Sequence, residues 1–347
     1  SIYGKSQREV IEKKKQLEQD VEKGLSLKVE DHTLGHWLEI YLEEYKRNQI
    51  KESTYLRYLV ALKQIDSAIG GIRIKNLQTS HLQRFYNNLV KELSVASVEY
   101  CHCLIVQALQ QAKEEGILVN NVAKKTKIPR KEKREIKPLS SEQFSRFVEV
   151  NKDNRYFLPV FLAYSTGMRR GEVMALKWKD VDLKKGQLKV CATLSTALGE
   201  DGRSKEIRVE RTKTQSSKRE IPLPNILVKA LKAHKLKQNK SKLKLGDGYQ
   251  DQGFVFPNRQ GKQLAFSVLR SNFKRMLERA GLSTQVRFHD LRHTYATLML
   301  ELGENPKVVQ ELLGHSNVSI TLNVYSHVNT DIKEKAAQKF NEKLKIL

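Results

Sequence analysis

The seven residues 166–172 read TGMRRGE, and they mark a boundary between two helices. Gly167 is suited to end the first helix, because glycine adopts the left-handed conformation that closes many helices. The next helix, predicted over 170–178, then begins at Arg169, where a guanidinium and unpaired backbone N–H groups both attract an anion. Glu172 shares the helix face of Arg169 and can orient it. A surface ion pair explains the same spacing, and this alternative stays open.

A second pattern, HDLRH at residues 289–293, opens another predicted helix. Positions i, i+3 and i+4 lie on one helix face, so His289, Arg292 and His293 converge. Two histidines at this spacing also occur in zinc sites, but a guanidinium beside a dication is unfavourable and the sequence offers no further set of ligands. The fork of arginine matches phosphoryl oxygens. The pattern therefore favours a phosphate over a metal ion.

Two further side chains fit a reaction at that phosphate. The stretch LLGH at 312–315 ends in His315, and Tyr325 follows ten residues later. A phenol with a pKa of about 10 attacks nothing unless neighbouring groups stabilise its phenolate. Tyr325 is therefore a candidate nucleophile only if the fold brings it to the arginines; packing is the alternative role.

The stretch TKTQSSKREIPL at residues 212–223 holds a candidate catalytic lysine. Lys213 lies in the turn before a predicted strand, from where an ammonium can reach across the edge of the sheet. Lys205, Lys218 and Arg219 lie nearby, so a generic basic loop is the alternative. We select Lys213 because it belongs to the turn rather than to the strand.

Around these patterns, residues 138–347 mix helices with a few strands. Helices are predicted over 141–150, 155–166, 170–178, 225–238, 265–280, 290–302, 306–313, 317–325 and 331–345. Strands are predicted over 180–184, 187–194 and 218–223. We expect one small antiparallel sheet within a mainly helical region.

The first third of the chain is helical throughout. An amphipathic helix is predicted over 6–23, and its sparse apolar stripe is too thin to be buried alone. Four more helices, over 33–46, 53–68, 80–91 and 97–115, predict a small bundle.

Residues 124–137 differ sharply in composition, with eight basic and two acidic residues. A solvated linker explains this run, and so does a linker that follows a DNA backbone. The candidate DNA contacts are Lys124, Lys125, Lys127, Arg130 and Lys131.

Composition narrows the class of protein. The 63 Lys and Arg against 39 Asp and Glu give a net charge of +24, which attracts polyanions and makes nucleic acid the first candidate partner. Apolar runs are too short to span a bilayer, and the first residues do not resemble a signal peptide. Three cysteines cannot form a disulfide framework, so we expect a reduced, cytoplasmic protein.

The order of the candidate residues resembles the catalytic set of the tyrosine recombinases, or phage-type integrases. That set is Arg, Lys, His, Arg, His or Trp, and Tyr, which here are Arg169, Lys213, His289, Arg292, His315 and Tyr325. The long segment 194–212 before the lysine departs from the family pattern. Residues 138–330 then correspond to the catalytic domain, and 28–123 are similar to the helical core-binding DNA domain.

Residues 1–27 are similar to the end of the arm-site DNA-binding domain of phage and conjugative-transposon integrases, so we expect a shortened form of a longer chain. Residues 331–347 are expected to form a helix that docks on a neighbouring subunit or caps its own. The expected fold is therefore mainly α, with a helical bundle, a basic linker at 124–137, and a mostly helical catalytic domain with a small antiparallel sheet.

The resemblance implies that Tyr325 attacks a scissile phosphodiester, giving a 3′-phosphotyrosyl bond and a free 5′-hydroxyl. Arg169 and Arg292 would neutralise the non-bridging oxygens, and His315 would add a hydrogen bond.

In the same scheme His289 would take the phenolic proton and Lys213 would protonate the leaving 5′-oxygen. Glu172 and His293 would orient the arginines and the histidine. No metal is needed, because the two guanidinium groups do what divalent ions do elsewhere. No nucleotide cofactor is needed, because the covalent bond conserves the energy for rejoining.

The implied partner is double-stranded DNA at attachment or transposon-end sites, bound by a homotetramer in the bacterial cytoplasm, with an excisionase and a host DNA-bending protein as further partners. The implied function is integration and excision of a mobile element. Two alternatives stay open: strand passage of the type IB topoisomerase kind, and a DNA-binding regulator without catalysis.

Overall fold

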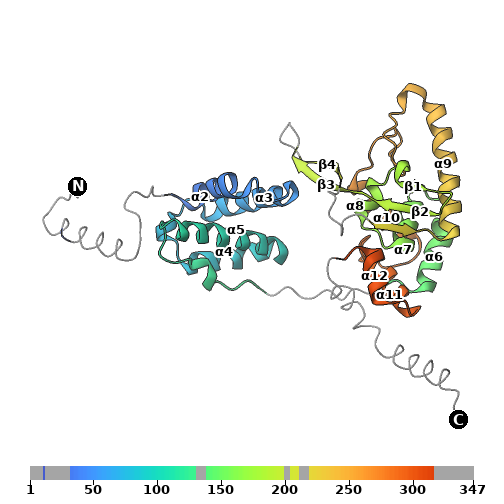
Figure 1. Cartoon of the computed structure of the whole chain (residues 1–347). Coiled ribbons are helices and arrows are strands. Elements are labelled where there is room, and N and C mark those ends of the chain that lie inside the picture. Colours follow the sequence, from blue (N-terminus) through green and yellow to red (C-terminus); the bar gives the residue numbers. More distant parts are fainter. Residues whose placement is uncertain (1–10, 12–31, 130–137, 199–203, 211–218, 316–347) are drawn as a thin grey trace, which may run out of the picture. The chain divides into compact units, whose positions relative to one another are not determined.

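The computed structural model describes residue 11 and residues 32–129, 138–198, 204–210 and 219–315 (Figure 1). Several predicted features lie outside these residues: the helices 6–23 (apart from Ile11), 317–325 and 331–345, and the side chains of Lys213, Tyr325, Arg130 and Lys131. The chain divides into two compact units, Ser1–Arg134 with Thr196–Lys205, and Glu135–Ser195 with Glu206–Leu347.

The first unit is a bundle of helices, as the sequence predicts. Its elements are α2 (Leu34–Ile40), the π-helical η1 (Tyr41–Lys46), α3 (Glu52–Ile69), η2 (Ile74–Asn76), α4 (Thr79–Glu92), α5 (Val95–Glu114) and η3 (Val122–Lys125).

Two glycines allow α2 and α3 to approach closely in this bundle. The N–H of Gly35 donates to the carbonyl of Gly70 at 2.9 Å. A Cβ on Gly70 would lie 2.5 Å from the backbone Cα of Asp66 and 2.7 Å from its carbonyl oxygen, so no larger residue fits there without a shift of the backbone. The buried indole of Trp37 donates to the carbonyl of Ala108 on α5 at 2.8 Å, which satisfies its N–H within the core.

The second unit is mostly helical around a small sheet. Its helices are α6 (Ser141–Asn151), α7 (Phe157–Thr166), α8 (Arg170–Ala175), η4 (Trp178–Asp180), α9 (Asn225–Leu245), η5 (Gly246–Gly248), α10 (Phe266–Arg279), α11 (Asp290–Glu301) and α12 (Pro306–Leu313). Its strands are β1 (Val181–Asp182), β2 (Gln187–Val190) and β5 (Arg219–Pro222). The strands β3 (Ala192–Leu198) and β4 (Ser204–Glu210) also lie mainly in this unit, and the end of β3 and the start of β4 fall within Thr196–Lys205 of the first unit.

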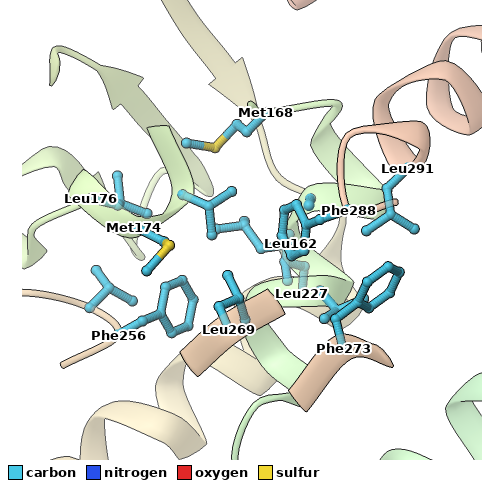
Figure 2. Close-up of a cluster of buried hydrophobic side chains, with 14 of the residues drawn as sticks. Leu162, Met168, Met174, Leu176, Leu227, Phe256, Leu269, Phe273, Phe288 and Leu291 are labelled. Atoms are coloured by element: carbon cyan, nitrogen blue, oxygen red, sulfur yellow. The ribbon is translucent and has the colours of Figure 1, made fainter. Parts of the chain in front are cut away.

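The three-stranded sheet has the order β1-β2-β5, and both pairings are antiparallel. Its core faces the helices: Leu188 and Ile221 pair across β2 and β5 and are almost fully buried. Figure 2 shows the helical side of this core, where side chains from α7, α8, α10 and α11 interlock, among them Leu162, Met174 and Phe273. The predicted mainly helical fold with a small antiparallel sheet is confirmed.

Helix α8 is three residues shorter than predicted. It ends at Ala175, and the carbonyl of Leu176 accepts from the N–H of Val255 at 2.9 Å. The N–H of Trp178 donates to the carbonyl of Gly253 at 2.9 Å. Because these backbone groups bond to a distant segment, the helix cannot continue through them.

The strand predicted over 187–194 is two strands. β2 ends at Val190 and β3 begins at Ala192, and the two belong to different sheets, since β3 pairs with the unpredicted β4. The apolar pattern runs through Cys191 without a break, so it does not reveal the change of sheet. Helix α9 runs seven residues beyond its predicted end, because Lys and Leu favour helix and no glycine occurs before Gly246.

Candidate active site

The turn between α7 and α8 places the first arginine. Gly167 has φ +62°, and a Cβ there would lie 2.4 Å from Leu313 Cδ2 and 2.6 Å from Tyr295 Cδ1. The position therefore needs glycine both for its left-handed backbone and for space. Arg169 follows as the extended N-cap residue of α8, as the sequence predicts.

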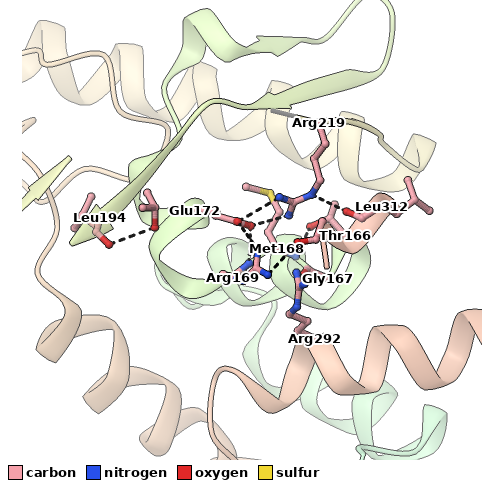
Figure 3. Close-up of polar contacts among 11 residues, drawn as sticks. Thr166, Gly167, Met168, Arg169, Glu172, Leu194, Arg219, Arg292 and Leu312 are labelled. Carbon is pink, nitrogen blue, oxygen red and sulfur yellow. Dashed lines mark hydrogen bonds and ion pairs between the residues drawn. The ribbon is translucent and has the colours of Figure 1, made fainter. Parts of the chain in front are cut away.

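Glu172 is the centre of the polar cluster drawn in Figure 3. Its side chain has no exposed surface. Its Oε2 accepts from the backbone N–H of Arg169 at 2.9 Å, and its Oε1 accepts from Arg169 Nη1 at 3.0 Å. The alternative of a surface ion pair is wrong, because the carboxylate is buried while the Arg169 side chain keeps 35% of its surface exposed.

A second arginine, Arg219, also binds this carboxylate. Arg219 Nη1 and Nη2 donate to Glu172 Oε1 and Oε2 at 3.2 and 2.7 Å. Burial raises the pKa of Glu172, but the hydrogen bonds and charge of Arg219, followed by the charge of Arg169, lower it to about 2. Glu172 is therefore an ionised carboxylate at neutral pH.

The sequence patterns do not predict Arg219 as a residue of the site, because it resembles one more basic residue of a loop. Arg219 begins β5, and it lies on the same side of the strand as Ile221, which packs in the core. Between them, Glu220 points to the opposite face and pairs with Lys189 at 2.8 Å, with both side chains more than half exposed. The strand alternation was therefore the available signal that Arg219 points inward.

Arg292 enters the cluster from α11. It is buried, and its Nη1 donates to the carbonyl of Gly167 at 2.8 Å (Figure 3). The turn that positions Arg169 is thus also held by Arg292, and the two guanidinium groups predicted from separate motifs come together.

The three histidines lie near these arginines. The rings of His289 and His293 meet edge to face, with 5.5 Å between their centroids. Burial, followed by the charges of His293, Arg292 and Arg169, lowers the pKa of His289. Burial also lowers the pKa of His293, with Arg292 adding to the effect and Asp290 opposing it. Both rings therefore favour the neutral form at neutral pH.

The end of α12 completes the cluster. Arg169 Nη2 donates to the carbonyl of Gly314 at 3.1 Å, and Arg219 Nε donates to the carbonyl of Leu312 at 2.7 Å. Burial, followed by the charges of Arg292, Arg169, His293 and Arg219, lowers the pKa of His315 to about 4. His315 is therefore neutral at pH 7 and has an N–H to donate.

This arrangement can attract and activate an anion. Arg169 and Arg219 share the Glu172 carboxylate, and Arg292 lies beside them against the Gly167 carbonyl, so positive charge is in surplus. Arg219, Arg292 and the histidines come from elements far from Arg169 in the sequence. The structure brings together Arg169, Glu172, His289, Arg292, His293 and His315; Lys213 and Tyr325 lie outside the described residues.

The linker lysines belong to the other unit. Lys124 and Lys125 end η3 and are exposed, and so is Lys127, whose backbone N–H donates to Gln83 Oε1 at 2.9 Å. Arg130 and Lys131 lie outside the described residues.

The part of the chain that the structure describes has neither a metal-binding cluster nor a membrane-spanning helix. In that part of the chain, no group of three or more His, Cys, Asp or Glu side chains could hold a metal ion. None of the helices found there combines the length and the apolar character needed to cross a membrane.

Comparison with known proteins agrees with the motifs. The phage integrase family matches residues 137–331, and the N-terminal SAM-like domain of phage integrases matches residues 33–90. A tyrosine recombinase XerC-like protein of Caldanaerobacter subterraneus subsp. tengcongensis is 34% identical over 98% of this chain and 91% of its own. The integrase of Staphylococcus phage L54a is 26% identical over 89% of this chain and 91% of its own.

Solved structures share the fold. The Tn1549 transposon integrase in complex with a circular intermediate DNA has a TM-score of 0.74 at 21% identity, covering 89% of this chain and 99% of that one. A lambda integrase tetramer bound to a Holliday junction has a TM-score of 0.61 at 21% identity, covering 93% of this chain and 88% of that one. The chain belongs to the phage integrase family of tyrosine recombinases, enzymes that cleave and rejoin DNA strands.

Proposed function

We propose that the arginine–histidine cluster around Glu172 is the site where one DNA phosphodiester is cleaved and rejoined, and that Tyr325 is its nucleophile. The observation that carries this proposal is the meeting of Arg169 and Arg292 at the Gly167 turn, with Nη1 of Arg292 2.8 Å from the Gly167 carbonyl. A phosphodiester passing through a pentacoordinate state gains negative charge on its non-bridging oxygens, and two positioned guanidinium groups stabilise that charge.

The histidines have the protonation states that such a reaction needs. His289 has a lowered pKa and is neutral at pH 7, so it can take the phenolic proton. His315 is also neutral and donates its N–H to the same phosphate. Lys213 protonates the leaving 5′-oxygen, while Glu172 and His293 keep the arginines and His289 in place.

The product of the first step is a 3′-phosphotyrosyl bond and a free 5′-hydroxyl. The 5′-hydroxyl of a partner strand attacks this bond in the second step, which frees the tyrosine. The phosphoester energy is conserved throughout, so the scheme uses no nucleotide cofactor. The two guanidinium groups stabilise the charge that a metal ion stabilises elsewhere.

The partner in this proposal is double-stranded DNA at the ends or attachment sites of a mobile element. The net charge of +24 and the exposed Lys124, Lys125 and Lys127 support phosphate binding, and Arg130 and Lys131 extend that basic run in the sequence. A homotetramer carries out strand exchange in the bacterial cytoplasm, assisted by an excisionase and a host DNA-bending protein. Residues 1–27 contribute to arm-site binding and 331–347 dock on a neighbouring subunit.

A covalent trap tests this proposal. Fragments of the host genome are incubated with the full chain, the protein is denatured, and DNA that stays attached is sequenced to find the site and its polarity. The site is then built into a duplex nicked beside the scissile phosphate, so that the released strand end diffuses away. We expect an adduct with the native protein and none with Tyr325→Phe; the same adduct in the Phe variant would overturn the nucleophile assignment.

A reaction with two intact duplexes distinguishes strand exchange from topoisomerase-like strand passage. Recombinant products of new length are expected with the native protein. Relaxation of supercoiled plasmid without any recombinant product would instead favour the topoisomerase alternative.

A further inference from the structure

Arg219 is the one arginine of the cluster that no expected catalytic role uses. It lies on β5 and reaches two elements at once: both oxygens of Glu172 on α8, at 3.2 and 2.7 Å, and the carbonyl of Leu312 on α12, at 2.7 Å. Its side chain is only 9% exposed. All three of its guanidinium nitrogens therefore donate to protein acceptors.

We propose that Arg219 is a positioning residue for DNA cleavage, which acts through Glu172 and the end of α12 and makes no contact with DNA. The inference rests on the proposed function, because it assigns to Arg219 the task of keeping Arg169 and His315 ready for the phosphate.

Charge explains why Glu172 needs two arginines. A buried carboxylate paired with Arg169 alone would neutralise that guanidinium, and little net charge would be left for a phosphate. Arg219 binds both carboxylate oxygens, so the charge of Arg169 stays in surplus. Arg169 Nη2 is then directed to the Gly314 carbonyl, 3.1 Å away, at the rim of the cluster where the side chain is partly exposed.

Arg219 also connects segments that carry other candidate catalytic residues. Arg219 comes six residues after Lys213 in the sequence, and Leu312 comes three residues before His315. A Cβ on Gly314 would lie 3.0 Å from Arg219 Nη1, so the turn after α12 packs directly against this guanidinium. One side chain therefore joins the segment that carries the candidate lysine, the helix that carries Arg169, and the turn that carries His315.

The test compares Arg219→Gln with Glu220→Gln in the full chain on the nicked duplex. Glu220 is the next residue on β5 and points to the opposite, exposed face, so its variant removes one ion pair of the same strand outside the site. We expect Arg219→Gln to cleave about 10- to 100-fold more slowly in single turnover, as when a group that orients reacting residues is lost. Its Kd for the duplex should stay within about twofold, and Glu220→Gln should behave as native.

Two readouts distinguish positioning from a general loss of structure. In a double-mutant cycle, Glu172→Gln with Arg219→Gln should be no slower than the slower single variant, because both changes break the same link.

The second readout is the pH dependence of the cleavage rate. The charged groups facing Glu172 are Arg169 from α8 and Arg219 from β5, with Arg292, His293 and His315 behind them. The charge of Arg219 lowers the pKa of both Glu172 and His315, so in Arg219→Gln both pKa values rise and the acid limb of the cleavage rate should move to higher pH.

The outcomes are separable. If the native protein forms no adduct, the proposed function fails. If it does, a folded Arg219→Gln that cleaves at the native rate, or a double variant whose losses multiply, overturns the role of Arg219. Where Arg219→Gln does not fold, Arg219→Lys takes its place: an ammonium cannot bind both Glu172 oxygens and the Leu312 carbonyl together, so we expect about a 10-fold slower cleavage, and a native rate would overturn the proposal.

Discussion

At the scale of single residues, Glu172 decides how the cluster behaves. Its carboxylate is fully buried and holds two arginines, and its pKa of about 2 lies below the ordinary value of 4.5. A depressed carboxyl pKa adds stability that is complete above the ordinary pKa and is lost as the pH falls through the folded-state value.

The second unit should therefore lose the stability that the Glu172 carboxylate contributes as the pH falls from 4.5 to 2. The free-energy difference is about 3 kcal/mol over that range. Thermal unfolding measured in steps across these pH values should show a steeper fall for the native protein than for Glu172→Gln. Parallel curves would contradict the assigned role of the carboxylate.

Arg169→Lys tests the phosphate contact at the same scale. The charge is kept, but an ammonium cannot hold Glu172 Oε1 and the Gly314 carbonyl and also reach a phosphate with a planar fork. Single-turnover cleavage should fall by about 100-fold while the Kd for DNA changes little. Near-native cleavage would contradict the phosphate-clamp role of Arg169.

The pair Arg169–Glu172 could be predicted because both residues lie within one helical turn, where spacing fixes the geometry. Arg219 could not be assigned in this way, since its partner on α8 is 47 residues away in the sequence and tertiary packing decides that β5 lies beside this helix. The alternation of Arg219, Glu220 and Ile221 indicated only which face of the strand was buried. It did not indicate what the buried arginine would meet.

At the scale of elements, the α7–α8 turn brings the two predicted arginines together. Gly167→Ala should destabilise the protein by about 2 kcal/mol or more, because the backbone has φ +62° and the new methyl would meet Leu313 and Tyr295. Thermal unfolding is the measurement. Gly248→Ala is the matched control in the same unit, since a Cβ there would meet nothing within 4 Å; equal effects of the two changes would contradict the steric argument.

The elements that the sequence predicted best are those with a strong local signal. Helices α6, α10 and α12 agree with their predicted ranges within one residue, because Ser140 and Asn305 cap the starts of α6 and α12, and apolar residues at helical spacing mark α10. The end of α8 and the break between β2 and β3 were wrong because distant backbone partners, at residues 253–255 and on β4, decide them.

At the scale of the whole molecule, the charge of +24 should make DNA binding strongly dependent on salt. Replacing a lysine that contacts a phosphate reduces the salt slope by about 1. Lys125→Gln should show this reduction, whereas Lys152→Gln, an exposed lysine of the other unit, should not. Fluorescence anisotropy at several salt concentrations measures the slope, and equal slopes for both variants would argue against DNA contact by the linker.

The central claim is that the Arg169–Arg292 cluster neutralises one DNA phosphate during cleavage. The most direct measurement compares the single-turnover cleavage of two duplexes, one with a natural scissile phosphate and one with a neutral methylphosphonate there, by the native protein and by Arg169→Ala. The variant should be severely slowed on the charged phosphate and far less slowed on the neutral one, because the charge that Arg169 balances is then absent. An equal loss on both duplexes would contradict the account.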